Sequence, residues 1–120
     1  MKIINRKIIT ISQDLNADRE WIYNLNLNFQ PDQMIVKSIT CNGNPAAPIT
    51  GNCLLYCSTI NEVLGSFYNN GCSVYPNTLY DSINYPINNI WVFQVLNVDR
   101  SVNATFNGGL IFQLEFVKFE

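Results

Sequence analysis

Apolar and polar residues alternate with a period of two over much of the chain, most clearly over residues 21–29. The odd positions of this segment are apolar, and Asn24, Asn26 and Asn28 occupy even positions between them. A β-strand sorts such a pattern onto two faces, whereas a helix would scatter it around its circumference. The segment therefore predicts a strand with one buried face and one asparagine-rich outer face.

Two further segments predict long strands. In residues 110–116 the even positions are apolar, and Gln113 and Glu115 lie opposite them. Residues 90–98 carry apolar side chains on both faces, which is typical of a central strand or of one that is covered on its outer face. Less regular runs predict the remaining strands at residues 3–12, 34–41, 53–59 and 78–83, while residues 62–68 fit either a strand or a helical turn.

Turn-forming residues separate these runs at intervals of about 8–12 residues, which is the spacing of all-β folds. They lie at residues 14–18, 30–32, 42–48, 69–71, 75–77, 85–86 and 107–109. No segment keeps the 3.6-residue period of a helix. We therefore expect residues 1–120 to form a single antiparallel β-sandwich domain of about eight strands. A jelly roll is the first expectation, and an immunoglobulin-like sandwich is the alternative.

Composition excludes several classes of function. The chain has 120 residues, of which 48% are hydrophobic and 13% charged, with no histidine and a formal net charge of -2. Without histidine there is no Ser-His-Asp or Cys-His nucleophile system and no histidine-ligated metal. The basic residues form no stripe that would bind nucleic acid. No apolar run is about 18 residues long, which is the length needed to span a membrane. The N-terminus lacks the layout of a signal peptide, so we expect synthesis in the cytoplasm.

Asparagine supplies the polarity that charge does not, with 18 residues in the chain. A surface rich in amides but poor in charge is easier to bury against another subunit than a surface of Lys and Glu. An AT-rich coding sequence would raise the same count, because the codons of Asn, Ile and Tyr are AT-rich. The two explanations are compatible.

The redox state of the four cysteines is open. Cys53 and Cys57 are four residues apart on a predicted strand, which is not the geometry of a tetrathiolate zinc site. A reducing cytoplasm favours buried thiols that pack as small hydrophobes. Disulfides formed after assembly or release remain the alternative, and the four residues Cys41, Cys53, Cys57 and Cys72 allow three connectivities. A cysteine nucleophile would lack its histidine partner.

Two loop motifs resemble a calcium site and a glycosylation site, but each is interpreted as an ordinary turn. Residues 14–18 alternate carboxylate and amide side chains like the start of a calcium loop. Arg19 stands where that loop needs Gly, and Leu25 where it needs Glu, so a polar turn is expected instead. Asn103 begins a glycosylation sequon that should stay unmodified in a hairpin loop. We predict no metal and no other cofactor.

Four tyrosines gather near turns in the least regular part of the chain: Tyr68, Tyr75, Tyr80 and Tyr85. Filling of the core is the plain explanation for aromatic residues, because each buries a large area. Exposed tyrosines would instead form a shallow site for a sugar or a receptor, or a contact between subunits, where tyrosine is enriched.

A family resemblance rests on residues 34–39 (MIVKSI), 63–67 (VLGSF), 86–93 (PINNIWVF) and 109–116 (GLIFQLEF). Together with the composition rich in Asn, Ile and Tyr, these segments resemble small all-β structural proteins of large DNA viruses of protists and of their virophages. The resemblance implies a compact sandwich, often trimeric, that serves as a minor capsid, cement or spike component. It implies no catalytic residues.

The first hypothesis is therefore a non-enzymatic viral structural protein that self-associates as a homotrimer and docks on other capsid proteins in the virion. The alternative is a carbohydrate- or receptor-binding β-sandwich module that uses the four tyrosines. An enzyme that relies on carboxylates is a third hypothesis, but Glu62, Asp81, Asp99 and Glu115 are far apart in the sequence.

Overall fold

The described residues form two packed antiparallel β-sheets. The computed structural model describes residues 2–16, 20–43, 52–68, 73–81, 85, 89–101 and 107–120. Their nine strands are β1 (Ile3–Asn16), β2 (Glu20–Asn24), β3 (Gln33–Gly43), β4 (Asn52–Cys57), β5 (Glu62–Tyr68), β6 (Ser73–Val74), β7 (Thr78–Asp81), β8 (Ile90–Asn97) and β9 (Asn107–Phe119). The predicted all-β sandwich is confirmed. Within these ranges no helix is long and apolar enough to cross a membrane.

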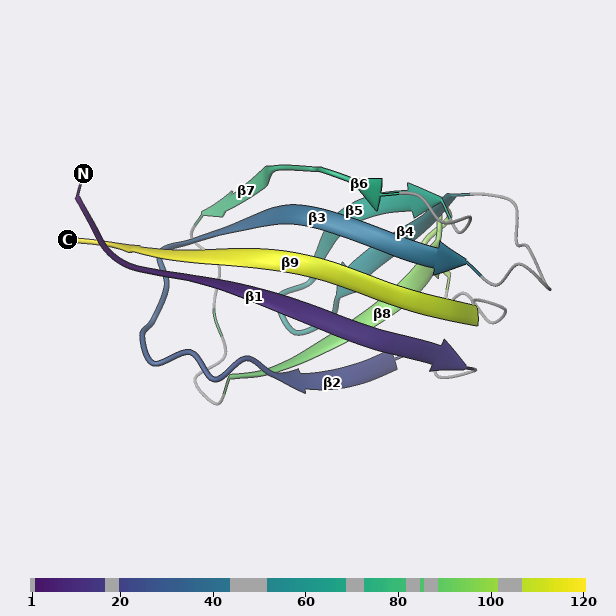
Figure 1. Ribbon diagram of the computed structural model, residues 1–120, viewed down its shortest axis with the longest axis horizontal. Coiled ribbons are helices and arrows are strands. Elements are labelled where there is room, and N and C mark those ends of the chain that lie inside the picture. Colours follow the sequence, from purple (N-terminus) through teal and green to yellow (C-terminus); the bar gives the residue numbers. More distant parts are fainter. Residues whose placement is uncertain are drawn as a thin grey trace.

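The first sheet, sheet A, is built on three long strands in the order β1-β9-β3. Both β6 and β7 pair with the far edge of β3, β6 at residues 39–40 and β7 at residues 33–36. Figure 1 shows β1, β9 and β3 side by side along the long axis, with both termini at one end. The last strand of the chain is therefore a central strand, flanked on both sides along most of its length.

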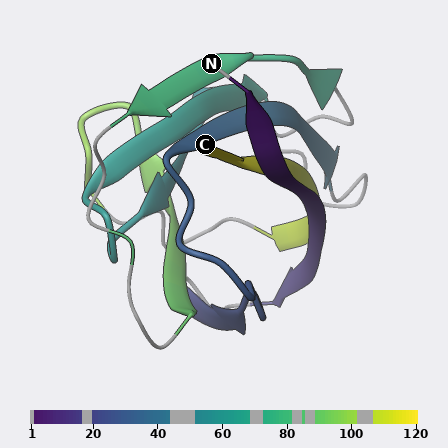
Figure 2. The same cartoon turned by 90° about the vertical axis from the view of Figure 1, so that its left-hand side faces the viewer.

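The second sheet, sheet B, has the strand order β2-β8-β4-β5. Strand β8 is central, as the pattern of residues 90–98 predicts, with β2 on one side and β4 on the other. In the view along the long axis, the strands of the two sheets surround a common interior (Figure 2). Inward side chains of both sheets fill this interior.

Aromatic rings join the two sheets at the centre of the core. Phe93 of β8 meets Phe112 of β9 edge to face, with 5.0 Å between ring centroids. Trp91 meets Phe116 in the same manner at 5.7 Å. Such pairs add about 0.5–1.5 kcal/mol each beyond the area that they bury. The apolar even positions of residues 110–116 therefore include the side chains of β9 that contact the other sheet.

The region of residues 62–68 is a strand, not a helical turn, and a bulge explains its irregular pattern. Leu64 and Phe67 are both buried although they are three residues apart, which a regular strand does not allow. The register of β4 and β5 shifts between Leu55 and Tyr56, so that Leu64 has no partner opposite it. The extra residue turns both side chains toward the core.

The predicted strand over residues 21–29 is too long. Strand β2 ends at Asn24, although Leu25 and Leu27 continue the buried alternation. Asn26 adopts a positive φ of 51°, and its N–H donates to the Asn24 side chain. The segment is held by Asn89, whose carbonyl accepts from Leu25 N–H and whose amide donates to the Leu27 carbonyl. Side-chain burial therefore persists where strand pairing has stopped.

Three predicted turns are also wrong in whole or in part. Residues 14–16 belong to β1, residues 42–43 to β3 and residues 107–109 to β9, because the long strands of sheet A pair to their ends: Leu15 lies opposite Gly108, and Asn42 opposite Gly109. The rest of the turn at residues 14–18 lies outside the described residues. So do the sequon that begins at Asn103 and the fourth cysteine, Cys72.

Candidate functional site

The structure separates the four tyrosines that the sequence groups. Tyr68 ends β5 with 49% of its surface exposed, and Tyr75 lies between β6 and β7 with 70% exposed. These two rings are available to a ligand or to another subunit.

Tyr80 and Tyr85 contribute to packing. The hydroxyl of Tyr80 donates to the Val63 carbonyl oxygen at 2.6 Å, and burial together with the Glu62 carboxylate raises the pKa of Tyr80. Tyr85 lies in the core with its ring centroid 5.8 Å from that of Trp91, and burial raises its pKa further. Neither residue offers an open aromatic face like those of Tyr68 and Tyr75.

The outer face of sheet A carries a row of four side chains that crosses the sheet in register. Ile8 of β1 lies opposite Glu115 of β9, which lies opposite Ile35 of β3, which lies opposite Leu79 of β7. Ile8 is 54% exposed and Leu79 is 48% exposed. The outward face of an antiparallel sheet is ordinarily polar where water covers it. This row is therefore a candidate interaction surface.

Glu115 lies in the middle of the row and is only 8% exposed. Its Oε1 is 3.1 Å from Arg6 Nε, and its Oε2 is 3.8 Å from Lys37 Nζ. The β3–β9 register shifts between Val36 and Ser38, so Lys37 is the extra residue of a bulge. The two cations offset the cost of burying the carboxylate, and the three groups together carry a net charge of +1.

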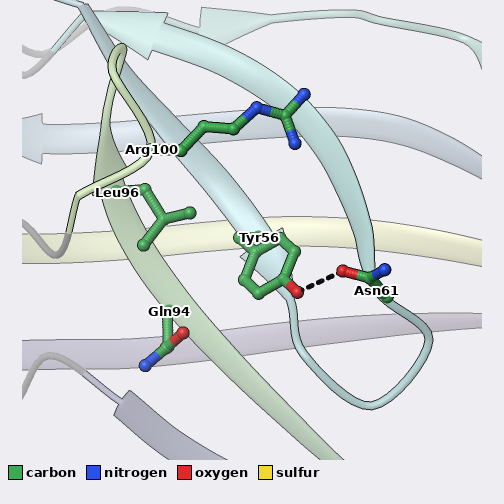
Figure 3. A pocket seen from close by; sticks show the side chains of 5 residues that line it. All are labelled: Tyr56, Asn61, Gln94, Leu96 and Arg100. Carbon is green, nitrogen blue, oxygen red and sulfur yellow. Dashed lines mark hydrogen bonds between the residues drawn. The ribbon is translucent and has the colours of Figure 1, made fainter.

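The outer face of sheet B contains a hollow of about 320 Å³. We call it the Arg100 hollow, and it is lined by Tyr56, Asn61, Gln94, Leu96 and Arg100. Figure 3 shows Arg100 and Gln94 on opposite sides of Leu96, with Tyr56 and Asn61 next to them. Leu96 is buried although it points away from the core cluster, because these neighbours cover it. The hollow thus has an apolar floor and polar walls.

A tight turn after β8 positions Arg100. Arg100 N–H donates to the Asn97 carbonyl, and Asn97 N–H donates to the Ser101 carbonyl at 2.8 Å. Asp99 accepts from both the N–H and the hydroxyl of Ser101, and these bonds lower the pKa of Asp99. Arg100 itself has a positive φ of 71°. The turn is therefore closed by its own hydrogen bonds, and Arg100 is the residue whose N–H closes it.

A second turn, between β4 and β5, positions Asn61. Asn61 N–H donates to the Ser58 carbonyl, and Ser58 N–H donates to the Val92 carbonyl of β8. Val92 N–H in turn donates to the Thr59 hydroxyl at 2.8 Å. Finally, the Tyr56 hydroxyl donates to Asn61 Oδ1 at 2.6 Å. Both walls of the hollow are therefore tied to the sheet below.

Cys41, Cys53 and Cys57 lie in the core. Burial raises the pKa of Cys57 to about 11, although hydrogen bonds from Ile60 and Thr59 act in the opposite direction. A thiol with so high a pKa is a poor nucleophile at neutral pH. These cysteines pack as small apolar residues.

Within the described ranges, no group of three or more His, Cys, Asp or Glu side chains is placed to hold a metal ion. The four carboxylates singled out from the sequence lie on different elements: Glu62 on β5, Asp81 on β7, Asp99 in the turn after β8, and Glu115 on β9. Glu115 is committed to its two cations.

Comparison of the chain with protein-family models, with curated proteins and with solved structures finds no significant match.

The Arg100 hollow is the part of the site that the sequence pattern did not predict. Its residues come from positions 56 to 100 and meet only because β4 pairs with β8, with Tyr56 opposite Gln94. One signal was present: Cys53, Leu55 and Cys57 alternate inward, which places Tyr56 on the outer face. Nothing comparable in the sequence places Arg100 beside it.

Proposed function

We propose that this chain is a non-enzymatic structural subunit that self-associates and, as part of a virion, serves as a minor capsid, cement or spike component. The observation that carries the proposal is the row on the outer face of sheet A, in which Ile8, Ile35 and Leu79 lie in register with the ion-paired Glu115. The pairing of the strands, the low charge and the resemblance of the sequence support the same proposal.

The strand pairing supports a jelly roll. In that fold a long antiparallel hairpin is wound into two sheets. The first strand therefore pairs with the last, the second with the second to last, and so on toward the middle of the chain. Here β1 pairs with β9, β2 with β8, β3 with both β6 and β7, and β4 with β5. If β6 and β7 count as one strand interrupted at residues 75–77, the four nested pairs are complete. Viral capsid domains use this fold, and so do lectins, so fold alone does not decide the function.

The occupant that we propose for the outer face of sheet A is a second copy of the chain. The three long strands together with β6 and β7, at about 4.8 Å between strands and about 3.4 Å per residue, cover roughly 700 Å². An interface of standard size buries about 600–1,000 Å² on each partner. The three charged groups of this face, Arg6, Lys37 and Glu115, already pair with one another, so few unpaired charges must lose their water when a second copy covers them. The homotrimer is the assembly that the resemblance implies.

Low charge favours such an assembly. Only 13% of the residues are charged, whereas an average soluble domain has about 25%. Few charges must then lose their water when two copies meet, which keeps the desolvation cost small. A subunit that docks on a capsid lattice through further surfaces has the same advantage.

The role in a particle is tested by quantitative mass spectrometry of purified particles and of the soluble fraction of the infected-cell lysate. A structural subunit is expected in the particles at a fixed ratio to the main capsid protein. Recovery in the soluble fraction alone would contradict the proposal.

A second candidate function, a carbohydrate- or receptor-binding module, is favoured by the exposure of Tyr68 and Tyr75. Such a module is expected to bind on a glycan array and to lose that binding in Tyr68→Ala or Tyr75→Ala variants whose oligomeric state is unchanged. An array without binding would exclude the glycan form of this candidate. A spike could combine both functions.

A further inference from the structure

The Arg100 hollow is distinct from the sheet A surface and from the exposed tyrosines. Its lining contains polar side chains that can bind a ligand. Arg100 forms no salt bridge with any of the described residues. An exposed arginine whose backbone is held in a closed turn, beside a hollow, presents a positive charge and several N–H donors to a bound anion. The first requirement on a ligand is therefore an anionic group.

The other polar groups of the hollow have defined roles. Asn61 Oδ1 accepts from the Tyr56 hydroxyl, which leaves the Asn61 amide nitrogen to donate. Gln94 Nε2 donates to Glu20 Oε2 at 2.9 Å, which leaves Gln94 Oε1 to accept. The Tyr56 oxygen also retains its lone pairs. The ligand must therefore both donate and accept hydrogen bonds beside its anionic group.

This combination discriminates between anions. Inorganic phosphate near neutral pH keeps one or two protons and can donate to Gln94 Oε1 or to the Tyr56 oxygen, but it has no apolar face for Leu96. A sugar hydroxyl donates and accepts, so it satisfies both kinds of group. The Leu96 floor and the Tyr56 ring offer an apolar surface to the C–H face of a sugar ring.

We propose that the Arg100 hollow binds an acidic sugar, with the carboxylate on Arg100 and the hydroxyls on Asn61, Gln94 and Tyr56. The volume of about 320 Å³ is at the small end of ligand pockets, which suits one sugar unit of a larger glycan. This inference goes beyond the assembly role proposed above and does not depend on it. It gives the protein a means to recognise a glycan while its sheet A face is occupied.

The probes are methyl glucuronide and methyl glucoside, which differ only in the carboxylate, together with inorganic phosphate. Each is titrated into the full-length, isotope-labelled protein while the backbone amide signals of Asn61, Gln94 and Arg100 are followed by NMR. Saturable shifts are expected with the glucuronide, and binding at least tenfold weaker is expected with the glucoside and with phosphate.

Two variants and one control complete the test. Arg100→Gln removes the cation, and Asn61→Asp keeps the acceptor for Tyr56 but opposes the ligand's charge. Both should weaken glucuronide binding about tenfold or more, since hydrogen bonds to charged groups are the strong ones. Lys2→Gln removes a charge from an exposed residue on another part of the molecule and should change nothing.

The proposal is overturned if the glucuronide causes no shifts at the hollow, if the glucoside or phosphate binds as tightly, or if binding survives both variants. The molar mass of each sample is recorded by light scattering. A failure of assembly is then seen separately from a failure of sugar binding.

Discussion

Ile39 of β3 packs its Cδ1 atom directly over the α carbon of Gly65 in β5, across the interface between the two sheets. A Cβ atom at position 65 would lie 2.8 Å from Ile39 Cδ1 and 3.1 Å from Pro76 Cγ. Ile39 is fully buried, so its side chain has little room to move aside. Glycine is therefore needed at this position for close approach rather than for an unusual backbone angle.

Gly65→Ala should lower the free energy of unfolding by about 1–3 kcal/mol, the usual effect of overpacking a core. Urea denaturation measures the change. Ile39→Val removes the opposing methyl group, so the double variant should be more stable than the sum of the two single effects by at least about 0.5 kcal/mol. Strict additivity would show that the contact does not restrict position 65.

Glu115→Gln should destabilise the protein by about 1 kcal/mol, because Arg6 and Lys37 lose their shared counter-charge at a poorly exposed position. The difference should shrink in high salt, which screens the remaining repulsion between the cations. Glu120→Gln, at the exposed chain end, is the matched control. Equal stability of the two variants would indicate that the ion pairs contribute nothing.

Cys57 should resist alkylation in the folded protein. With a pKa of about 11, roughly one part in a thousand is thiolate at about pH 8, against about a tenth for an ordinary thiol of pKa 9.0. Its complete burial blocks the reagent as well. Iodoacetamide followed by peptide mass spectrometry should label Cys57 only after denaturation. Labelling of the native protein at the rate of a free thiol would contradict this.

The same thiol should make stability fall at alkaline pH. Above about pH 9 the unfolded chain loses the Cys57 proton while the folded protein keeps it up to about pH 11. The unfolded state then binds fewer protons, so the free energy of unfolding decreases as pH rises, by up to about 1.4 kcal/mol per pH unit for this group. Cys57→Ala should flatten the slope between these pH values, measured by urea titration at each pH. An unchanged slope would assign the effect to other groups.

Charged substitutions on the outer face of sheet A should weaken self-association. Ile8→Lys or Leu79→Lys places an ammonium group in the proposed contact, and the dissociation constant should rise at least tenfold, because an unpaired buried charge costs more than about 1.4 kcal/mol. Ile22→Lys, on the exposed outer face of sheet B, is the control. Sedimentation velocity over a concentration series measures all three. An equal effect of Ile22→Lys would assign the contact to another surface.

The sequence predicts the elements whose alternation and strand pairing coincide. Phe112, Leu114 and Phe116 alternate with outward residues along β9, and the structure places all three in the core. The prediction failed where side chains stay buried although the backbone no longer pairs as a strand. Leu25 and Leu27, for example, are buried beyond the end of β2. It was ambiguous where the bulge at Leu64 breaks the period of two.

The candidate sites were less accessible to sequence reasoning, because register between distant strands creates them. Glu115 was correctly assigned to the outward face, but its low exposure follows from Arg6 and Lys37 on the two neighbouring strands. The tyrosines were grouped by proximity in sequence, whereas pairing and packing send Tyr80 inward and leave Tyr75 exposed. Spacing along the chain does not encode such differences.

Self-association through the outer face of sheet A is the central claim, and the molar mass of the wild-type protein in solution tests it most directly. Gel filtration coupled to light scattering, at micromolar concentration, should give a multiple of the chain mass. For the trimer the value is about 41 kDa, three times the 13.7 kDa of one chain. A single species of 13.7 kDa across the whole concentration range would contradict the account.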